Sequence, residues 1–192
     1  MIKIISKRKC IKLIVIVFII LVLCVLFKFQ NEFLKVIYPK KFEEYVSKYA
    51  LEYEVEENLI YAVIKAESNF DEDAISNKEA KGLMQLMNPT ANEVAKKINI
   101  QITDENIQEP EYNIMLGTKY LSMMITKYGN IELALTAYNA GSGTVDKWIS
   151  DGTLKEDGSN IENIPYKETN NYVRKILRDY KIYNEIWNAR DG

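Results

Sequence analysis

The chain has 192 residues, of which 25 are Lys or Arg, 27 are Asp or Glu, two are Cys and none is His. Without histidine the chain cannot form a Ser–His–Asp triad, a Cys–His pair or a histidine-ligated zinc or haem site. Because 47% of the residues are hydrophobic and 27% are charged, the composition is that of a chain with an apolar core and excludes intrinsic disorder throughout.

Charge divides the chain into two parts. Residues 1–29 carry six basic side chains and no acidic one, which leaves 19 of the 25 basic residues and all 27 acidic residues, a net charge of −8, in the remainder. An acidic globular part repels a phosphate backbone, so we expect no nucleic acid among the partners.

The first predicted element is a membrane-spanning helix. No charged residue interrupts positions 13–27. Counting from 11 to 29 gives about 28 Å of helix, which matches the apolar thickness of a bilayer when Lys12 and Lys28 extend to its two surfaces.

Basic residues before this helix predict its orientation. We expect a cytoplasmic tail over 1–10, an uncleaved signal anchor over 11–29 and a stalk over 30–39, with the rest of the chain on the outer side of the membrane as a single-pass protein. A cleaved signal peptide and a lipoprotein signal ending at Cys24 are the alternatives. No small-residue cleavage site follows the apolar run, and Leu23 is bulky where a lipoprotein signal needs a small residue.

Beyond residue 40 apolar residues recur at spacings of three and four, which predicts helices almost throughout. Asn88 as an N-cap before Pro89 marks the start of one helix, and Gly129 marks the end of another. The predicted helices cover 40–51, 56–68, 89–98, 111–128, 131–138, 144–149 and 167–187. The segment 150–165 is rich in Asp, Gly, Ser and Asn and predicts a surface loop. Residues 40–192 are therefore expected to form one mostly α domain.

Glu67 is the residue whose position predicts chemistry. It follows Val63 by four residues and Ile60 by seven, so it lies on the apolar stripe of its helix and near the C-terminal end. Desolvation and the negative end of the helix dipole both favour the protonated carboxyl. A carboxyl group that stays neutral near pH 7 can act as a general acid. The alternative is that Glu67 extends past the core into solvent.

Four segments stand out along the chain: Ala66–Phe70 (AESNF), Gly82–Thr90 (GLMQLMNPT), Ala134–Gly141 (ALTAYNAG) and Glu168–Val173 (ETNNYV). In this order they resemble the motifs of the soluble lytic transglycosylase family of peptidoglycan-cleaving enzymes. The resemblance extends from about Tyr45 to about Ile176. It implies a goose-lysozyme-like helical fold and a substrate bond, the β-1,4 link between N-acetylmuramic acid and N-acetylglucosamine.

The resemblance implies one catalytic carboxylate. Glu67 would first protonate the glycosidic oxygen and then take the proton of the muramic acid C6 hydroxyl, which attacks the anomeric carbon and leaves a 1,6-anhydro sugar. An ordinary glycoside hydrolase needs a second carboxylate as nucleophile or base. Here the nucleophile is tethered to the substrate, and the tether supplies the effective concentration that a positioned water would otherwise need.

Other residues around Glu67 receive roles from the same resemblance. Gln85 interrupts the apolar run 83–87, so its amide needs hydrogen-bonding partners, in the fold or in the substrate cleft that the resemblance favours. Ser76 is expected to form a hydrogen bond near Glu67 and the sugar. The alternative is that it is an ordinary polar residue of a surface loop. Met84 is expected to line the cleft, with packing in the core as the alternative.

Two tyrosines and an asparagine complete the predicted site. Tyr138 is expected to direct its hydroxyl into the cleft, and Asn139 is expected to hold the helix break or contact sugar. Tyr172 would bring its hydroxyl to Glu67. Glu168, close to the start of the same helix, is expected to cap or brace it.

Two other functions stay open. A muramidase of the same fold would hydrolyse the same bond with water, and Asp71, Glu72 and Asp73 are the nearest acids that could serve as its second carboxylate. A catalytically silent glycan-binding subunit of an envelope machine would be marked by loss of the acid at position 67, where Glu67 is present. We expect no metal and no cofactor. The expected partners are peptidoglycan strands, the cytoplasmic membrane and an envelope component of unknown identity.

Overall fold

The structure is a computed structural model that describes residues 7–188, with side chains described from residue 15 onwards except at positions 27 and 31. It divides into two compact units, Met1–Pro39 and Lys40–Gly192. Within residues 7–188 the secondary structure is helical, and the strand-like pairing is limited to isolated bridges in one loop. The predicted fold class is therefore confirmed.

The first unit contains α1 (Lys7–Ile37). Its segment Val15–Ile37 has a mean hydropathy of 2.1, and it is long and apolar enough to cross a membrane. Large apolar side chains such as Phe18 and Leu21 are exposed along it. The predicted stalk over 30–39 is helical as far as Ile37, and residues 1–6 of the predicted tail lie outside the described part of the chain.

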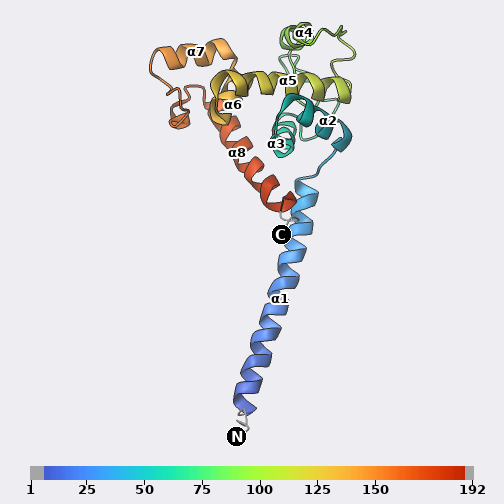
Figure 1. The fold of residues 1–192 in the computed structure, drawn as a ribbon, viewed down its shortest axis with the longest axis vertical. Helices are drawn as coiled ribbons and strands as arrows, with labels where there is room; N and C mark the ends of the chain where they lie inside the picture. The colour runs from blue at the N-terminus through green and yellow to red at the C-terminus, as the bar shows by residue number, and fades with distance from the viewer. Residues whose placement is uncertain (1–6, 189–192) are drawn as a thin grey trace. The chain divides into compact units, whose positions relative to one another are not determined.

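The second unit is an all-helical domain (Figure 1). Its elements are α2 (Glu43–Tyr53), α3 (Glu57–Glu67), α4 (Asn88–Lys97), α5 (Pro110–Tyr128), α6 (Ile131–Ala140), α7 (Ser142–Ser150), the 3₁₀ helix η1 (Ile161–Asn163) and α8 (Lys167–Trp187). Each α-helix that the spacing predicts is present. The short η1 interrupts the loop predicted over 150–165.

The starts of α2 and α4 differ from the prediction for identifiable reasons. Helix α2 begins three residues later than expected. Phe42 has a left-handed backbone with φ 58°, so the regular helix cannot extend further toward the N-terminus. Helix α4 has Met87 as its N-cap residue, and the side chain of the predicted cap, Asn88, instead donates to Asp104 at 3.0 Å. In both cases tertiary context overrides a local signal.

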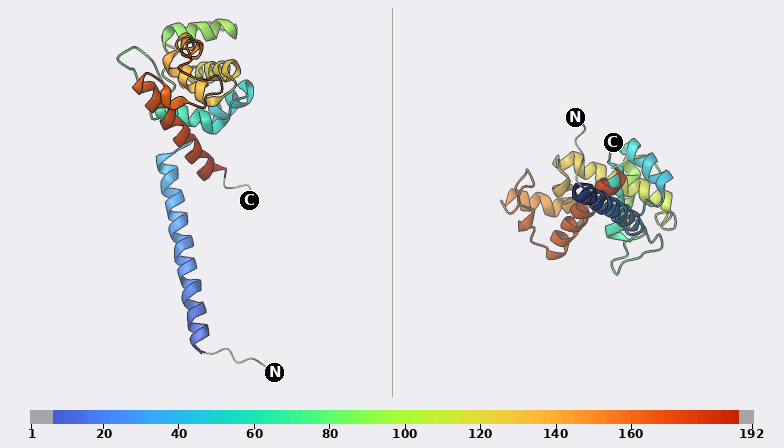
Figure 2. Two further views of the ribbon diagram at one scale, coloured as in Figure 1. Left: turned by 90° about the vertical axis from the view of Figure 1, so that its left-hand side faces the viewer. Right: turned by 90° about the horizontal axis from the view of Figure 1, so that it is seen from below.

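The helices pack around an apolar core. In Figure 1, α5 crosses the domain with α4 on one side and α2 on the other, in agreement with the packed pairs α4–α5 and α2–α5. Helix α6 packs against α5, α7 and α8. The further views in Figure 2 show helices crossing at varied angles instead of forming parallel layers. Within the described chain the largest fully buried side chains include Tyr61, Tyr183, Leu59, Ile60, Leu83 and Met84.

The pairing of α3 with α8 determines where Glu67 lies. The amide nitrogen of Asn58 donates to the side-chain oxygens of Asn184 at 2.7 Å and Asn188 at 3.0 Å. Further along, the rings of Tyr61 and Tyr183 stack with centroids 5.7 Å apart. These contacts align the two helices, so the C-terminal end of α3 lies against the N-terminal half of α8.

Candidate active site

Glu67 is the last residue of α3, and its carboxylate meets α8. The hydroxyl of Tyr172 donates to Oε1 of Glu67 at 2.7 Å, although the two residues are 105 positions apart. The bond is charge-assisted when Glu67 is ionised, and it directs the carboxylate toward α8.

The surroundings of Glu67 shift its acidity. Burial raises the pKa of the Glu67 carboxyl to about 7, although the hydroxyl of Tyr172 and the charge of Lys175 act in the opposite direction and lower it. Near neutral pH the carboxyl is therefore present in both protonation states. A group in this condition can donate a proton in one step and accept one in the next.

A tightly turned loop connects α3 to α4 and forms one wall of the site. Residues Asn69, Phe70, Glu79 and Gln85 in it have positive φ angles, as does Gly82. Antiparallel bridges join residue 75 to 81 and 81 to 86. The hydroxyl of Ser68 also donates to the carbonyl of Leu83 at 2.9 Å, which ties the loop to the end of α3.

A pocket of about 410 Å³ opens beside Glu67. Its lining residues come from α3, the loop, α6 and α8: Glu67, Ser76, Asn77, Lys78, Ala80, Gln85, Met87, Tyr138, Asn139 and Glu168. Five of the seven residues predicted for the site line this pocket. The remaining two bind residues that line it: the backbone carbonyl of Met84 accepts from Tyr138, and the hydroxyl of Tyr172 donates to Glu67.

Gln85 and Ser76 each combine a structural bond with a place in the pocket. Nε2 of Gln85 donates to the carbonyls of Ala74 and Gly82, both at 3.0 Å, so its Oε1 remains available as an acceptor. Oγ of Ser76 accepts the backbone N–H of Ala80 at 3.0 Å and stabilises its turn. The hydroxyl proton of Ser76 is free to bind a ligand while the oxygen holds the turn.

Tyr138 and Asn139 bring the end of α6 to the pocket. The hydroxyl of Tyr138 donates to the carbonyl of Met84 at 2.9 Å, so its oxygen can act only as an acceptor toward a ligand while this bond is made. Oδ1 of Asn139 accepts the hydroxyl of Thr169 at 2.7 Å and links α6 to α8, while the amide nitrogen stays free. Burial raises the pKa of Tyr138 well above its usual value, so it stays neutral.

The expectation for Met84 needs correction. Its side chain is fully buried and does not line the pocket. The sulfur lies 3.9 Å from the hydroxyl of Thr118 and packs against Gly117 on α5, where any larger residue would clash with it. Met84 contributes its backbone carbonyl to Tyr138, so the alternative of core packing describes its side chain.

Glu168 lines the pocket, a position that the sequence analysis did not predict. It was expected to brace α8, yet its exposed side chain lines the pocket together with Glu67. The signal was its spacing: Glu168 precedes Tyr172 by four residues and so shares a helix face with the tyrosine that binds Glu67. Asp71, Glu72 and Asp73, the acids considered for a second carboxylate, are exposed and do not line the pocket.

Comparisons with known proteins identify the relatives of this chain. Residues 44–160 match the family described as the transglycosylase SLT domain. The chain is 31% identical over 159 residues to a soluble lytic murein transglycosylase of Salmonella typhimurium, covering 81% of this chain and 25% of the relative. It is 38% identical over 116 residues to membrane-bound lytic murein transglycosylase C of Yersinia pestis, covering 55% of this chain and 32% of the relative.

A solved structure has the same fold. The inactive mutant of lytic transglycosylase Slt from Pseudomonas aeruginosa superposes with a TM-score of 0.74 and 36% identity, covering 81% of this chain and 26% of that chain. The chain thus spans about a quarter of the length of its soluble relatives. Since the family match covers more than half of the residues and includes Glu67, the loop and the end of α6, this chain belongs to the transglycosylase SLT domain family.

Proposed function

We propose that this protein is a lytic transglycosylase that cleaves the β-1,4 bond between N-acetylmuramic acid and N-acetylglucosamine, with Glu67 as its single acid and base. The observation that carries the proposal is a Glu67 carboxyl that has a pKa of about 7 and lies beside an open pocket. The names of two relatives, both lytic murein transglycosylases, support the substrate and the type of reaction.

Two proton transfers make up the proposed reaction. Protonated Glu67 gives its proton to the glycosidic oxygen as the bond to the anomeric carbon breaks, and the leaving sugar departs with a hydroxyl group. Ionised Glu67 then takes the proton of the C6 hydroxyl of muramic acid as that oxygen bonds to the anomeric carbon. Glu67 ends protonated, as it began, and no water is consumed.

The rest of the pocket would hold the sugars during these steps. Oε1 of Gln85, the hydroxyl of Ser76 and the amide nitrogen of Asn139 are free to bind sugar hydroxyl or acetamido groups. Tyr172 would keep the carboxylate of Glu67 in one orientation through both transfers. This positioning reduces the entropy that the reaction must lose on reaching its transition state.

We also propose that α1 anchors the enzyme in the cytoplasmic membrane, with residues 1–10 in the cytoplasm, 11–29 in the bilayer and the domain 40–192 on the wall side. The apolar segment Val15–Ile37 and the membrane-bound relative support this. The five basic residues that precede the apolar run support the orientation.

The test is mass spectrometry of the glycans that the full chain, in detergent micelles, releases from purified peptidoglycan. We expect products lighter by one water molecule than hydrolysis products, and we expect the isosteric variant Glu67→Gln to release none. Loss of activity should appear in kcat, because Gln cannot donate the proton in the transition state.

A second candidate function, hydrolysis by water, is favoured by one observation: Glu168 lines the same pocket as Glu67. If Glu168 activates water, the products carry reducing ends and Glu168→Gln is as inactive as Glu67→Gln. If the C6 hydroxyl is the nucleophile, Glu168→Gln keeps the anhydro product and changes mainly KM. Reducing-end products from the wild-type chain would overturn the proposal of a transglycosylase.

A further inference from the structure

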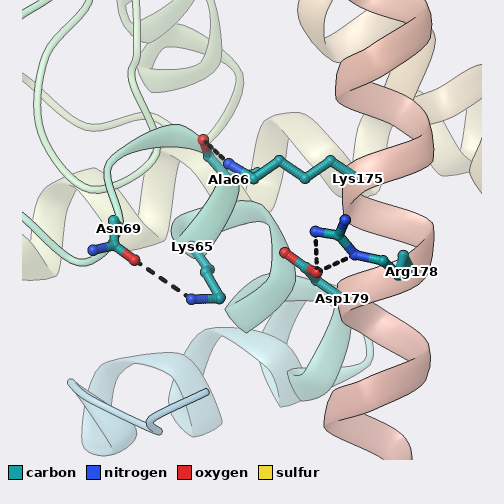
Figure 3. A network of polar contacts seen from close by, with 6 residues as sticks. All are labelled: Lys65, Ala66, Asn69, Lys175, Arg178 and Asp179. Atoms are coloured by element: carbon teal, nitrogen blue, oxygen red, sulfur yellow. Dashed lines mark hydrogen bonds and ion pairs between the residues drawn. The ribbon is translucent and has the colours of Figure 1, made fainter. Parts of the chain in front are cut away.

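Lys175 lies one helical turn beyond Tyr172 on α8 and reaches the same end of α3. Its Nζ donates to the carbonyl oxygen of Ala66 at 3.2 Å, and Ala66 immediately precedes Glu67 (Figure 3). Two side chains of α8, three positions apart, therefore bind two consecutive residues of α3. Tyr172 binds the carboxylate of Glu67, and Lys175 binds the backbone beside it.

The end of a helix is where a cation has its largest effect. The last carbonyls of α3 lack helical partners, and the aligned peptide dipoles leave partial negative charge there. Both features oppose ionisation of Glu67, the last residue of α3. The ammonium of Lys175 satisfies one of these carbonyls and offsets the negative potential.

Other charged or titratable groups face this corner from several elements. On α3, Lys65 lies near Asn69, and on α8, Arg178 binds Asp179 at 2.8 Å (Figure 3). The remaining groups around Glu67 are Tyr172 and Glu168 from α8, Tyr138 from α6 and Lys78 from the loop. Asp179 is fully buried, and its negative charge is matched by Arg178 next to it. Of these basic groups, Lys175 is the one that binds the backbone beside Glu67.

We propose that Lys175 is a positioning residue that holds the end of α3 and tunes the acid strength of Glu67, an inference that rests on the function proposed above. Glu67 must become an anion when it has donated its proton, at the moment when the sugar is positively charged. The ammonium of Lys175 stabilises this anion. Without it, burial and the helix dipole would bind the proton more tightly and weaken Glu67 as an acid.

Three substitutions separate the charge of Lys175 from its hydrogen bond. Lys175→Met removes both, Lys175→Gln removes the charge and keeps a donor for Ala66, and Lys175→Arg keeps both. Lys181→Met is the matched control, because Lys181 is an exposed lysine on the same helix and pairs with Glu185 at 3.9 Å. The full chain in detergent micelles is labelled with ¹³C at glutamate Cδ, and the Glu67 resonance is assigned from its loss in Glu67→Gln.

Two readouts are recorded for each variant: the pKa of the Glu67 carboxyl by NMR titration, and the pH profile of kcat/KM on peptidoglycan. For Lys175→Met and Lys175→Gln we expect both the carboxyl titration and the alkaline limb of the profile to move up by about half a pH unit, the size of one partly screened charge. Lys175→Arg and Lys181→Met should titrate as the wild type does.

The outcomes distinguish this inference from the proposed function. An unchanged Glu67 titration in Lys175→Met, or an equal shift in Lys181→Met, would overturn the role of Lys175. A wild-type chain that releases no glycan, with a Glu67 titration that still shifts in Lys175→Met, would overturn the proposed function and support the electrostatic role. A shift in Lys175→Met without one in Lys175→Gln would contradict tuning by charge.

Discussion

Asn113 shows how one buried side chain can organise a catalytic loop. It is fully buried on α5, and its Oδ1 accepts the backbone N–H of Met84 at 2.7 Å. Its Nδ2 donates to the carbonyls of Lys81 at 2.9 Å and Ile107 at 2.8 Å. Gly82 has no room for a side chain beside it, because a Cβ there would lie 2.6 Å from Nδ2. One side chain of α5 therefore determines the backbone conformation of the loop that forms a wall of the pocket.

Replacing Asn113 with Leu should lower the free energy of unfolding by about 3 kcal/mol or more. The substitution leaves the buried N–H of Met84 and the carbonyl of Ile107 without partners, and each loss costs about 1–3 kcal/mol. Urea unfolding followed by tryptophan fluorescence gives the measurement. Asn92→Ala removes an exposed side-chain bond to Asn88 and should cost less than about 0.5 kcal/mol. Similar losses in the two variants would contradict this role.

Glu67 makes the stability of the domain depend on pH. Its pKa is raised from 4.5 to about 7 in the folded protein, so the folded state holds the proton more tightly than the unfolded state. The stabilisation is complete below pH 4.5 and is lost as the pH rises to 7. We expect a loss of about 2 kcal/mol between these limits, after discounting for the exposed part of the side chain.

Glu67→Gln cannot ionise, so it should not show this loss. Unfolding of both proteins at pH 5 and pH 8 measures the difference, and the variant should be relatively more stable at pH 8. Parallel behaviour of the two proteins would mean that Glu67 has an ordinary acidity in the fold. It would also remove the main support for its proposed role.

At the scale of elements, the helices followed from the sequence and the loop between α3 and α4 did not. The three-and-four spacing of Leu59, Ile60 and Val63 was sufficient because a helix is determined by contacts on one of its faces. The loop has no such period. Its shape depends on Asn113, 29 residues after Met84, so no local pattern could predict that the Met84 side chain is buried or that Gln85 has φ 48°.

Helix α6 depends on its N-cap for its orientation. Oδ1 of Asn130 accepts the N–H of Leu133 at 2.8 Å, while Nδ2 donates to the carbonyls of Tyr128 and Glu156, both at 3.3 Å. Asn130→Ala should reduce stability by about 1–2 kcal/mol. Asn130→Ser keeps a side-chain acceptor for the cap and loses only the two long bonds, so it should cost less. Thermal unfolding of the variants compares them, and equal losses would contradict a capping role.

The whole molecule combines a basic apolar segment with an acidic domain. Under the proposed anchoring, apolar side chains that are exposed along α1, such as Ile19 and Ile20, contact lipid instead of protein. The domain in turn has its own buried apolar core. This contrast could be predicted from the composition alone, because it depends on runs of residue types and not on contacts.

Placing two charges in α1 should release the protein from the membrane. The double variant Ile19→Lys with Ile20→Lys adds about 3 kcal/mol per charge to the cost of insertion. We expect it in the soluble fraction after carbonate extraction, while the wild type sediments with membranes. Leu51→Lys is the control, because Leu51 is the most exposed of the large apolar side chains described in the domain, at 85%. Membrane retention of the double variant would contradict anchoring by α1.

The bond between Tyr172 and Glu67 also has a consequence for biosynthesis. A ribosome makes α3 about 100 residues before it makes the tyrosine that orients the carboxylate. Until α8 has emerged and docked, Glu67 lacks its hydroxyl partner and the pocket lacks the wall that carries Glu168. Under the proposed localisation, a nascent chain therefore carries an unassembled site during its export. Under the proposed function, an enzyme able to cut the cell wall stays harmless until its own synthesis is nearly complete.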